Sequence, residues 1–124
     1  ERNAVWQFHS HGNHQSPFML YIVGDEYWVA TFPPGISRWR IVAQRKIIRG
    51  IPTRWRLEVK WATDETGYFR LYRNEQLIWE QYGEATAYDK GSIPYPRLGM
   101  YCTVWPEDIN SRVYDLINFQ VSAG

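Results

Sequence analysis

The chain has 124 residues but only one cysteine, Cys102, and a single thiol excludes an internal disulfide framework. No run is long and apolar enough to span a bilayer, so no membrane partner is expected. The net charge is only +1, which argues against a general affinity for nucleic acid. The first residues, Glu-Arg-Asn-Ala-Val-Trp, lack the apolar segment of a signal peptide. These absences leave one globular domain, residues 1–124, whose function must be sought in its side-chain patterns.

Aromatic residues, by contrast, are abundant: 7 Trp and 9 Tyr bring the aromatic share to 17%. Aromatic side chains pack well on the pleated surface of a sheet, so this composition favours strands. Flat rings also stack on the apolar faces of sugar rings, which makes carbohydrate recognition a hypothesis to test. Any single ring is still more often part of a core than of a ligand platform.

No stretch shows a convincing helical period, whereas alternation of apolar and polar residues recurs along the chain. Short strands separated by Gly, Pro, Asn and Asp predict an antiparallel β-sandwich or barrel. The expected strands span residues 5–11, 18–23, 26–32, 38–43, 54–61, 68–73, 76–81, 95–105 and 112–121.

Two of these strands carry polar functional groups on one face. In the segment 95–105, Tyr95, Arg97, Tyr101 and Trp105 point away from an apolar face, because successive side chains of a strand alternate. A row of phenols and a guanidinium is more typical of a binding groove than of a face that merely meets water. In the first strand, Gln7, His9 and His11 share one face in the same way.

A basic zone occupies the middle of the chain, and the strand 54–61 is its clearest part. Arg54 and Arg56 alternate there with Trp55 and Leu57, so their register is well fixed. This polar face suits either a solvated sheet surface or part of a groove for an acidic partner.

The quoted strands resemble those of a known family. Gln7-Phe8-His9 resembles the Gln-x-His strand of jelly-roll polysaccharide lyases, and the segment 95–101 resembles their late Tyr-x-Lys-x-Gly-x-Tyr strand. Between them, Trp55, the turn glycine Gly67 and Asn74 resemble the pattern of the heparin-lyase-like branch. The resemblance covers most of the chain and implies an all-β, antiparallel, concanavalin-like jelly-roll sandwich related to alginate and glucuronan lyases.

The resemblance implies cleavage of an acidic, uronate-containing polysaccharide by β-elimination, without a cofactor or metal. Gln7 would then donate to the uronate carboxylate, and His9 would assist or act as a base. Tyr101 matches the catalytic phenol of the family, and Arg97 stands where the family often has Lys. Neutralising the carboxylate stabilises the enolate-like intermediate that forms when the C5 proton is removed.

The family also carries an arginine strand upstream of Gln-x-His, whereas only Glu1-Arg2 stands at that place here. The chain is therefore expected to lack N-terminal strands of the family fold. A second chain or a homo-oligomer could complete the sheet. The resemblance further implies a secreted or periplasmic protein. His11, Tyr95, Arg54, Arg56 and Trp105 are expected to be weaker, substrate-binding candidates.

Other functions have partial support in the sequence. His9, His11 and His14 could hold a metal, but no glutamate follows at the spacing that a cupin-like site requires. Glu58, Glu80 and Glu84 could serve a glycoside hydrolase, but Arg56 and Lys60 on the face of Glu58 favour a salt-bridged surface strand, and no Glu-x-Asp-x-x-Glu strand is present. The serious alternative is a non-catalytic, lectin-like sandwich that holds sugar on the same polar face.

Overall fold

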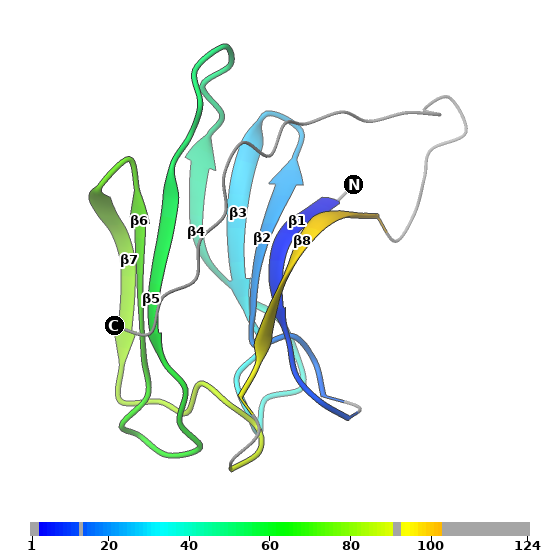
Figure 1. Ribbon diagram of the computed structural model, residues 1–124, viewed down its shortest axis with the longest axis vertical. Helices are drawn as coiled ribbons and strands as arrows, with labels where there is room; N and C mark the ends of the chain where they lie inside the picture. The colour runs from blue at the N-terminus through cyan, green and yellow to red at the C-terminus, as the bar shows by residue number, and fades with distance from the viewer. Residues whose placement is uncertain (1–2, 13, 91–92, 103–124) are drawn as a thin grey trace.

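The computed structural model describes residues 3–12, 14–90 and 93–102, with only the backbone described for residues 100–102 (Figure 1). These residues form antiparallel strands and no helix. The strands are β1 (Asn3–His9), β2 (Phe18–Val23), β3 (Glu26–Thr31), β4 (Arg40–Lys46), β5 (Trp55–Lys60), β6 (Tyr68–Arg73), β7 (Gln76–Tyr82) and β8 (Tyr95–Cys102).

The strands form two sheets that face each other (Figure 1). One sheet has five strands in the order β4-β3-β2-β1-β8, and the other has three in the order β5-β6-β7. The all-β sandwich predicted from the alternation is confirmed. β2 and β6 have the predicted bounds, and the other described strands differ by a few residues at their ends. The expected strand 112–121 and the end of 95–105 lie outside the described residues.

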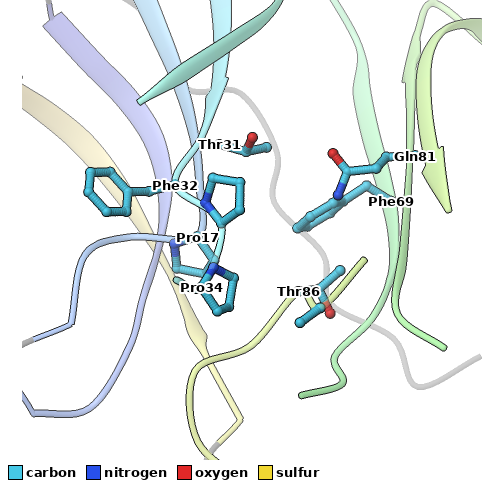
Figure 2. Close-up of a pocket in the computed structure, with 9 residues that line it drawn as sticks. Pro17, Thr31, Phe32, Pro34, Phe69, Gln81 and Thr86 are labelled. Atoms are coloured by element: carbon cyan, nitrogen blue, oxygen red, sulfur yellow. The ribbon is translucent and has the colours of Figure 1, made fainter. Parts of the chain in front are cut away.

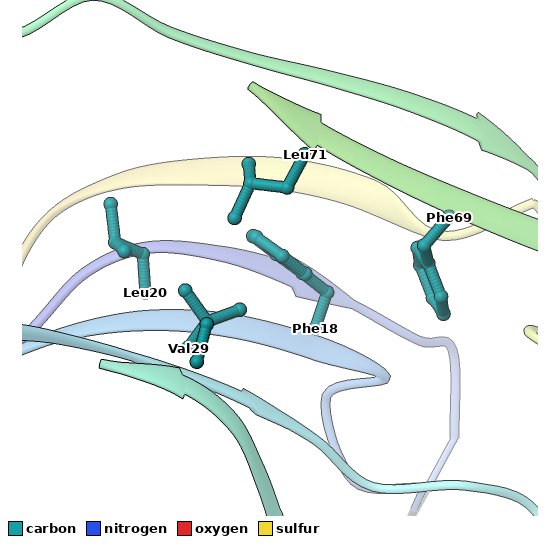
Figure 3. Packing of buried hydrophobic residues seen from close by; sticks show 6 residues of the cluster. Phe18, Leu20, Val29, Phe69 and Leu71 are labelled. Atoms are coloured by element: carbon teal, nitrogen blue, oxygen red, sulfur yellow. The ribbon is translucent and has the colours of Figure 1, made fainter. Parts of the chain in front are cut away.

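The core between the sheets consists of side chains from the alternating apolar positions. Phe18, Leu20 and Val29 come from the five-stranded sheet, while Phe69 and Leu71 come from β6 (Figure 3). All five are at most 2% exposed. Trp and Tyr rings of both sheets surround this cluster, so much of the aromatic content belongs to the core. The core therefore fixes which face of each strand remains available for function.

The alternation of β1 is interrupted at Val5. Ala4 pairs with Tyr101 and Trp6 pairs with Leu98, so one residue of β1 stands opposite two residues of β8. Such a β-bulge changes the face on which the following residues lie. Val5 packs against the core cluster with its neighbour Trp6, whereas strict alternation predicts it on the face of Gln7.

Gly99 lies in the stretch of β8 that stands opposite this bulge. Its φ of +153° is a backbone conformation that glycine adopts far more readily than other residues. A glycine at this position therefore allows β8 to follow the irregular register.

One end of the sandwich is closed by the connection that follows β7. The Thr86 hydroxyl donates to the Lys60 carbonyl oxygen at 2.6 Å and accepts from the Ala62 amide at 2.9 Å. Figure 2 shows Thr86 and Phe69 facing Pro17, Thr31 and other residues of the opposite sheet across a narrow crevice. The crevice has no room for a water-sized molecule, so it closes the core and does not provide a ligand site.

The second face of the five-stranded sheet carries a smaller apolar cluster. Ala4, Met19, Tyr21 and Ala30 are all less than 9% exposed there, and Trp28 and Trp39 are among the residues that pack against them. This is the face on which Gln7 lies, because Gln7 pairs directly with Met19. Among the described residues there is no helix with the length and apolar character needed to cross a membrane.

Candidate active site

The pairing of β1 with β8 brings the two polar strands together. Gln7 lies directly opposite Arg97, and His9 lies directly opposite Tyr95. Directly paired residues share a face, with Cβ atoms about 4.5–5.5 Å apart. The structure therefore gathers four of the sequence-predicted site residues, from strands near the two ends of the described chain, on one patch of the sheet.

Three rings and a guanidinium make up the outer part of this patch. The Tyr95 ring lies 5.9 Å from the His9 ring and 5.3 Å from the His11 ring, measured between centroids. Arg97 donates to the Tyr95 hydroxyl oxygen at 3.3 Å, and its guanidinium lies 5.5 Å from the centre of that ring. Arg97 is exposed, so its positive charge is presented to solvent.

His9 has an altered acidity in this setting. Partial burial lowers the pKa of His9 below its ordinary value of 6.5, and the positive charge of Arg97 lowers it further. The imidazole is therefore neutral at neutral pH and can accept a proton or a hydrogen bond. A neutral imidazole is the form that a general base requires.

Gln7 is half-buried and contacts the loop between β1 and β2. The Ser16 hydroxyl donates to its side-chain carbonyl oxygen Oε1 over 3.4 Å. Beside it, a hollow of about 160 Å³ is lined by residues on both sides of the bulge, among them Gln7, Arg97 and Gly99. The site thus combines an amide, a guanidinium and open space at the seam between β1 and β8. No sequence pattern points to Ser16 as a partner of Gln7, since this contact depends on the path of the loop.

The register places the backbone of Tyr101 opposite Ala4, in line with the positions of Gln7 and Arg97. The side chain of Tyr101 and the whole of Trp105 lie outside the described residues. The convergence of the Tyr101 phenol with His9 therefore stays a prediction.

Arg54 and Arg56 do not join this site. Both belong to the β5 region of the other sheet, where the Trp55 and Leu57 side chains face the core and Arg56 faces outward. The Arg56 guanidinium is paired with Glu58 and, at 3.2 Å, with Glu75, while Arg54 lies 3.7 Å from Glu75. The hypothesis that their face lines the groove is therefore corrected: these side chains form a solvated charge network on the opposite layer.

His14 is also separate from His9 and His11. Its Nε2 atom lies 2.9 Å from an Asp89 carboxylate oxygen, and its ring stacks on Tyr88 with centroids 4.7 Å apart. Burial raises the pKa of Tyr88 to about 12, and its hydroxyl donates to the Phe32 carbonyl oxygen. Tyr88 is therefore a structural phenol that stays protonated. Within the described part of the chain, no three His, Cys, Asp or Glu side chains gather as metal ligands.

The glutamates considered for hydrolysis are occupied in ion pairs or face solvent. Glu58 pairs with Arg56 and lies 3.2 Å from Arg70, and Glu84 lies 3.0 Å from Arg40. Glu80 is exposed and accepts from Tyr82. Glu58 therefore has the surface ion pairs that its sequence context favoured.

Comparison with known proteins identifies the fold and the family of the chain. The chain has the fold of the endo-β-1,4-glucuronan lyase from the fungus Trichoderma reesei, with a TM-score of 0.64 and 23% sequence identity. The match covers 83% of this chain and 50% of that enzyme, so the chain spans about half of the enzyme's length. No match was found among curated proteins. The family model for polysaccharide lyases matches residues 2–118, and the chain therefore belongs to the polysaccharide lyase family.

Proposed function

We propose that the chain carries the catalytic strands of a lyase that cleaves a uronate-containing polysaccharide by β-elimination. The observation that carries the proposal is the register of β1 and β8, which places Gln7 and His9 opposite Arg97 and Tyr95 on one face. Family membership and the fold shared with a glucuronan lyase support the reaction class. A glucuronan-type polymer is the first substrate to test, and a secreted or periplasmic location is part of the same proposal.

In the proposed reaction, a base removes the C5 proton of a uronate and the C5–H electron pair moves toward the carboxylate. The resulting enolate-like intermediate expels the oxygen on C4, a C4–C5 double bond forms, and the leaving oxygen receives a proton. The Gln7 amide and the Arg97 guanidinium would neutralise the carboxylate, which is the largest electrostatic requirement of the step. Tyr101 would supply the base, the acid or both, with His9 assisting as a neutral imidazole.

Tyr101 provides the sharpest test of this chemistry. Tyr101→Phe removes only the phenolic hydroxyl, so we expect elimination to fall by at least about a hundredfold, as general acid–base catalysis contributes about 10²–10⁴-fold. Glucuronan, alginate and heparin are incubated with each protein, and the ultraviolet absorbance of the unsaturated uronate product is followed. Binding of the same polymers, measured by calorimetry, should remain nearly unchanged.

The matched control is Tyr82→Phe, because Tyr82 is exposed on the other sheet. Unchanged elimination by Tyr101→Phe would refute the assignment of Tyr101. Polymer binding without any unsaturated product from the wild-type protein would refute catalysis and favour the lectin-like alternative.

A further inference from the structure

Two hydrogen-bond donors stand side by side at the centre of the site. Gln7 and Arg97 are directly paired across β1 and β8, and each can donate from its side chain. An amide also has an acceptor end, so Gln7 has two choices. If its oxygen turned toward Arg97, the two side chains could satisfy each other. If its nitrogen faced the site, both would offer donors to an incoming carboxylate.

Contacts on either side of the pair decide between these choices. Arg97 donates to the Tyr95 hydroxyl oxygen, and Gln7 accepts the Ser16 hydroxyl at Oε1. The carbonyl end of the amide is thus held on the loop side, which leaves Nε2 free to donate. A rotated amide would exchange this hydrogen bond for one donated by Nε2 to the Ser16 hydroxyl oxygen, so the orientation in the structure is the one that keeps Nε2 available for a substrate.

Ser16 is well placed to act as such an anchor. It is 7% exposed and immediately precedes Pro17, which is also buried. A residue before proline is restricted to extended backbone conformations, so few alternatives compete with the observed position. The contact of His14 Nε2 with an Asp89 carboxylate oxygen and the stacking of His14 on Tyr88 join the same loop to the connection that follows β7. The hydroxyl therefore lies between two positions with contacts of their own, His14 and the buried Pro17.

We propose that Ser16 is a positioning residue that orients the Gln7 amide so that its Nε2 group donates to the substrate carboxylate. This proposal rests on the proposed lyase function and names a residue that acts through Gln7 without touching the reacting atoms. The 3.4 Å separation is long for a hydroxyl donor. Hydrogen bonds in an unliganded active site are often long and shorten when the substrate binds.

The kinetic test uses Ser16→Ala with glucuronan as substrate. Charge on the carboxylate grows as the enolate forms, so a poorly oriented amide should affect the transition state more than binding. We expect kcat to fall about five- to tenfold, which corresponds to the loss of one ordinary hydrogen bond, while KM changes less than about twofold. Ser10→Ala is the matched control, because the buried Ser10 hydroxyl has no hydrogen-bond partner among the described residues.

A double-mutant cycle separates positioning from a general structural effect. In a Gln7→Ala background, Ser16→Ala should cause no further loss of kcat, since the group that Ser16 orients is already absent. An equal loss of kcat in both backgrounds, or no loss in either, would overturn the proposal.

A second readout does not depend on activity. The side-chain amide signals of Gln7, assigned by their absence in Gln7→Ala, should shift and exchange with solvent faster in Ser16→Ala than in Ser10→Ala. If the wild-type protein forms no unsaturated uronate from any polymer, the proposed function fails. The side-chain amide signals of Gln7 then remain as the test of its positioning by Ser16. Amide signals that do not change in Ser16→Ala would overturn the positioning role whether or not the protein is a lyase.

Discussion

At the scale of single residues, the electrostatic environment of His9 depends on one neighbour across the strand pair. The positive charge of Arg97 lowers the pKa of this imidazole, although burial is the larger cause. A depressed pKa means that the unfolded chain binds more protons than the folded protein at pH values around and below 6.5. The contribution of His9 to stability is therefore fully present above pH 6.5 and declines as the pH falls through the folded-state pKa.

Arg97→Gln should raise the pKa of His9 toward 6.5 without reaching it, because burial remains. Arg97→Lys keeps the positive charge and should keep the pKa low. A nuclear magnetic resonance titration of the imidazole measures both variants. A His9 pKa that is the same in Arg97→Gln and the wild type would show that the guanidinium does not act on this ring.

Some positions in the site follow from local sequence patterns, and others depend on contacts between distant parts of the chain. Alternation alone placed Gln7 with His9, and Arg97 with Tyr95, because each pair is two residues apart in a strand. The adjacency of the two strands came from the family resemblance, since no local pattern specifies which strands pair. The contact between Ser16 and Gln7 and the pairing of His14 with Asp89 depend on loop paths that short-range patterns do not encode.

At the scale of elements, hydrogen bonds of Thr86 link the end of β5 to the connection after β7. It is 1% exposed, and its hydroxyl serves both the Lys60 carbonyl and the Ala62 amide. Gly67 packs so closely against it that an added Cβ would lie 2.8 Å from the Thr86 hydroxyl oxygen. A small residue and a bridging hydroxyl therefore close this end of the sandwich together.

Thr86→Val preserves the shape of the side chain but leaves a backbone donor and acceptor without their partner. We expect the free energy of unfolding to fall by about 2 kcal/mol, because an unsatisfied buried polar group costs about 1–3 kcal/mol. Thr86→Ser keeps the hydroxyl and should lose only about 1 kcal/mol with the methyl group. Urea denaturation measures both, and equal losses in the two variants would contradict the bridging role.

The turn between β6 and β7 illustrates how far element boundaries follow from sequence. The predicted strands 68–73 and 76–81 leave only Asn74 and Glu75 between them, and both have positive φ angles, 49° and 66°, as a two-residue type I′ hairpin requires. The bulge at Val5 was not predictable in this way, because no turn residue marks it within β1. Its counterpart Gly99 gave a weak signal, since a glycine inside a strand often accompanies a bulge.

At the scale of the whole molecule, the two sheets share one core, and Phe69 is its central ring. Its ring lies 6.2 Å from Phe18 in the other sheet, and 5.8 Å and 5.3 Å from Trp61 and Trp79. With 2% exposure, this side chain contributes to the packing of both layers at once. The sheets should therefore unfold together in a single transition.

Phe69→Ala should lower the free energy of unfolding by about 3–5 kcal/mol, the usual cost of removing a large buried ring. Phe69→Leu fills part of the space and should cost less. The transitions followed by far-ultraviolet circular dichroism and by tryptophan fluorescence should coincide in both variants. Two separate transitions would show that the sheets are stabilised independently.

The bulge at Val5 also determines on which face of β1 the residues before it lie. The alternation of side chains between the two faces of the sheet restarts at the bulge. Asn3 and Ala4 therefore do not continue the alternation of Gln7 and His9. Ala4 pairs with Tyr21 and Trp6 pairs with Leu20, so removing Val5 would restore regular alternation against β2 and leave Ala4 on the face of Gln7. The bulge thus separates the alternation of Asn3 and Ala4 from that of the Gln7–Arg97 pair.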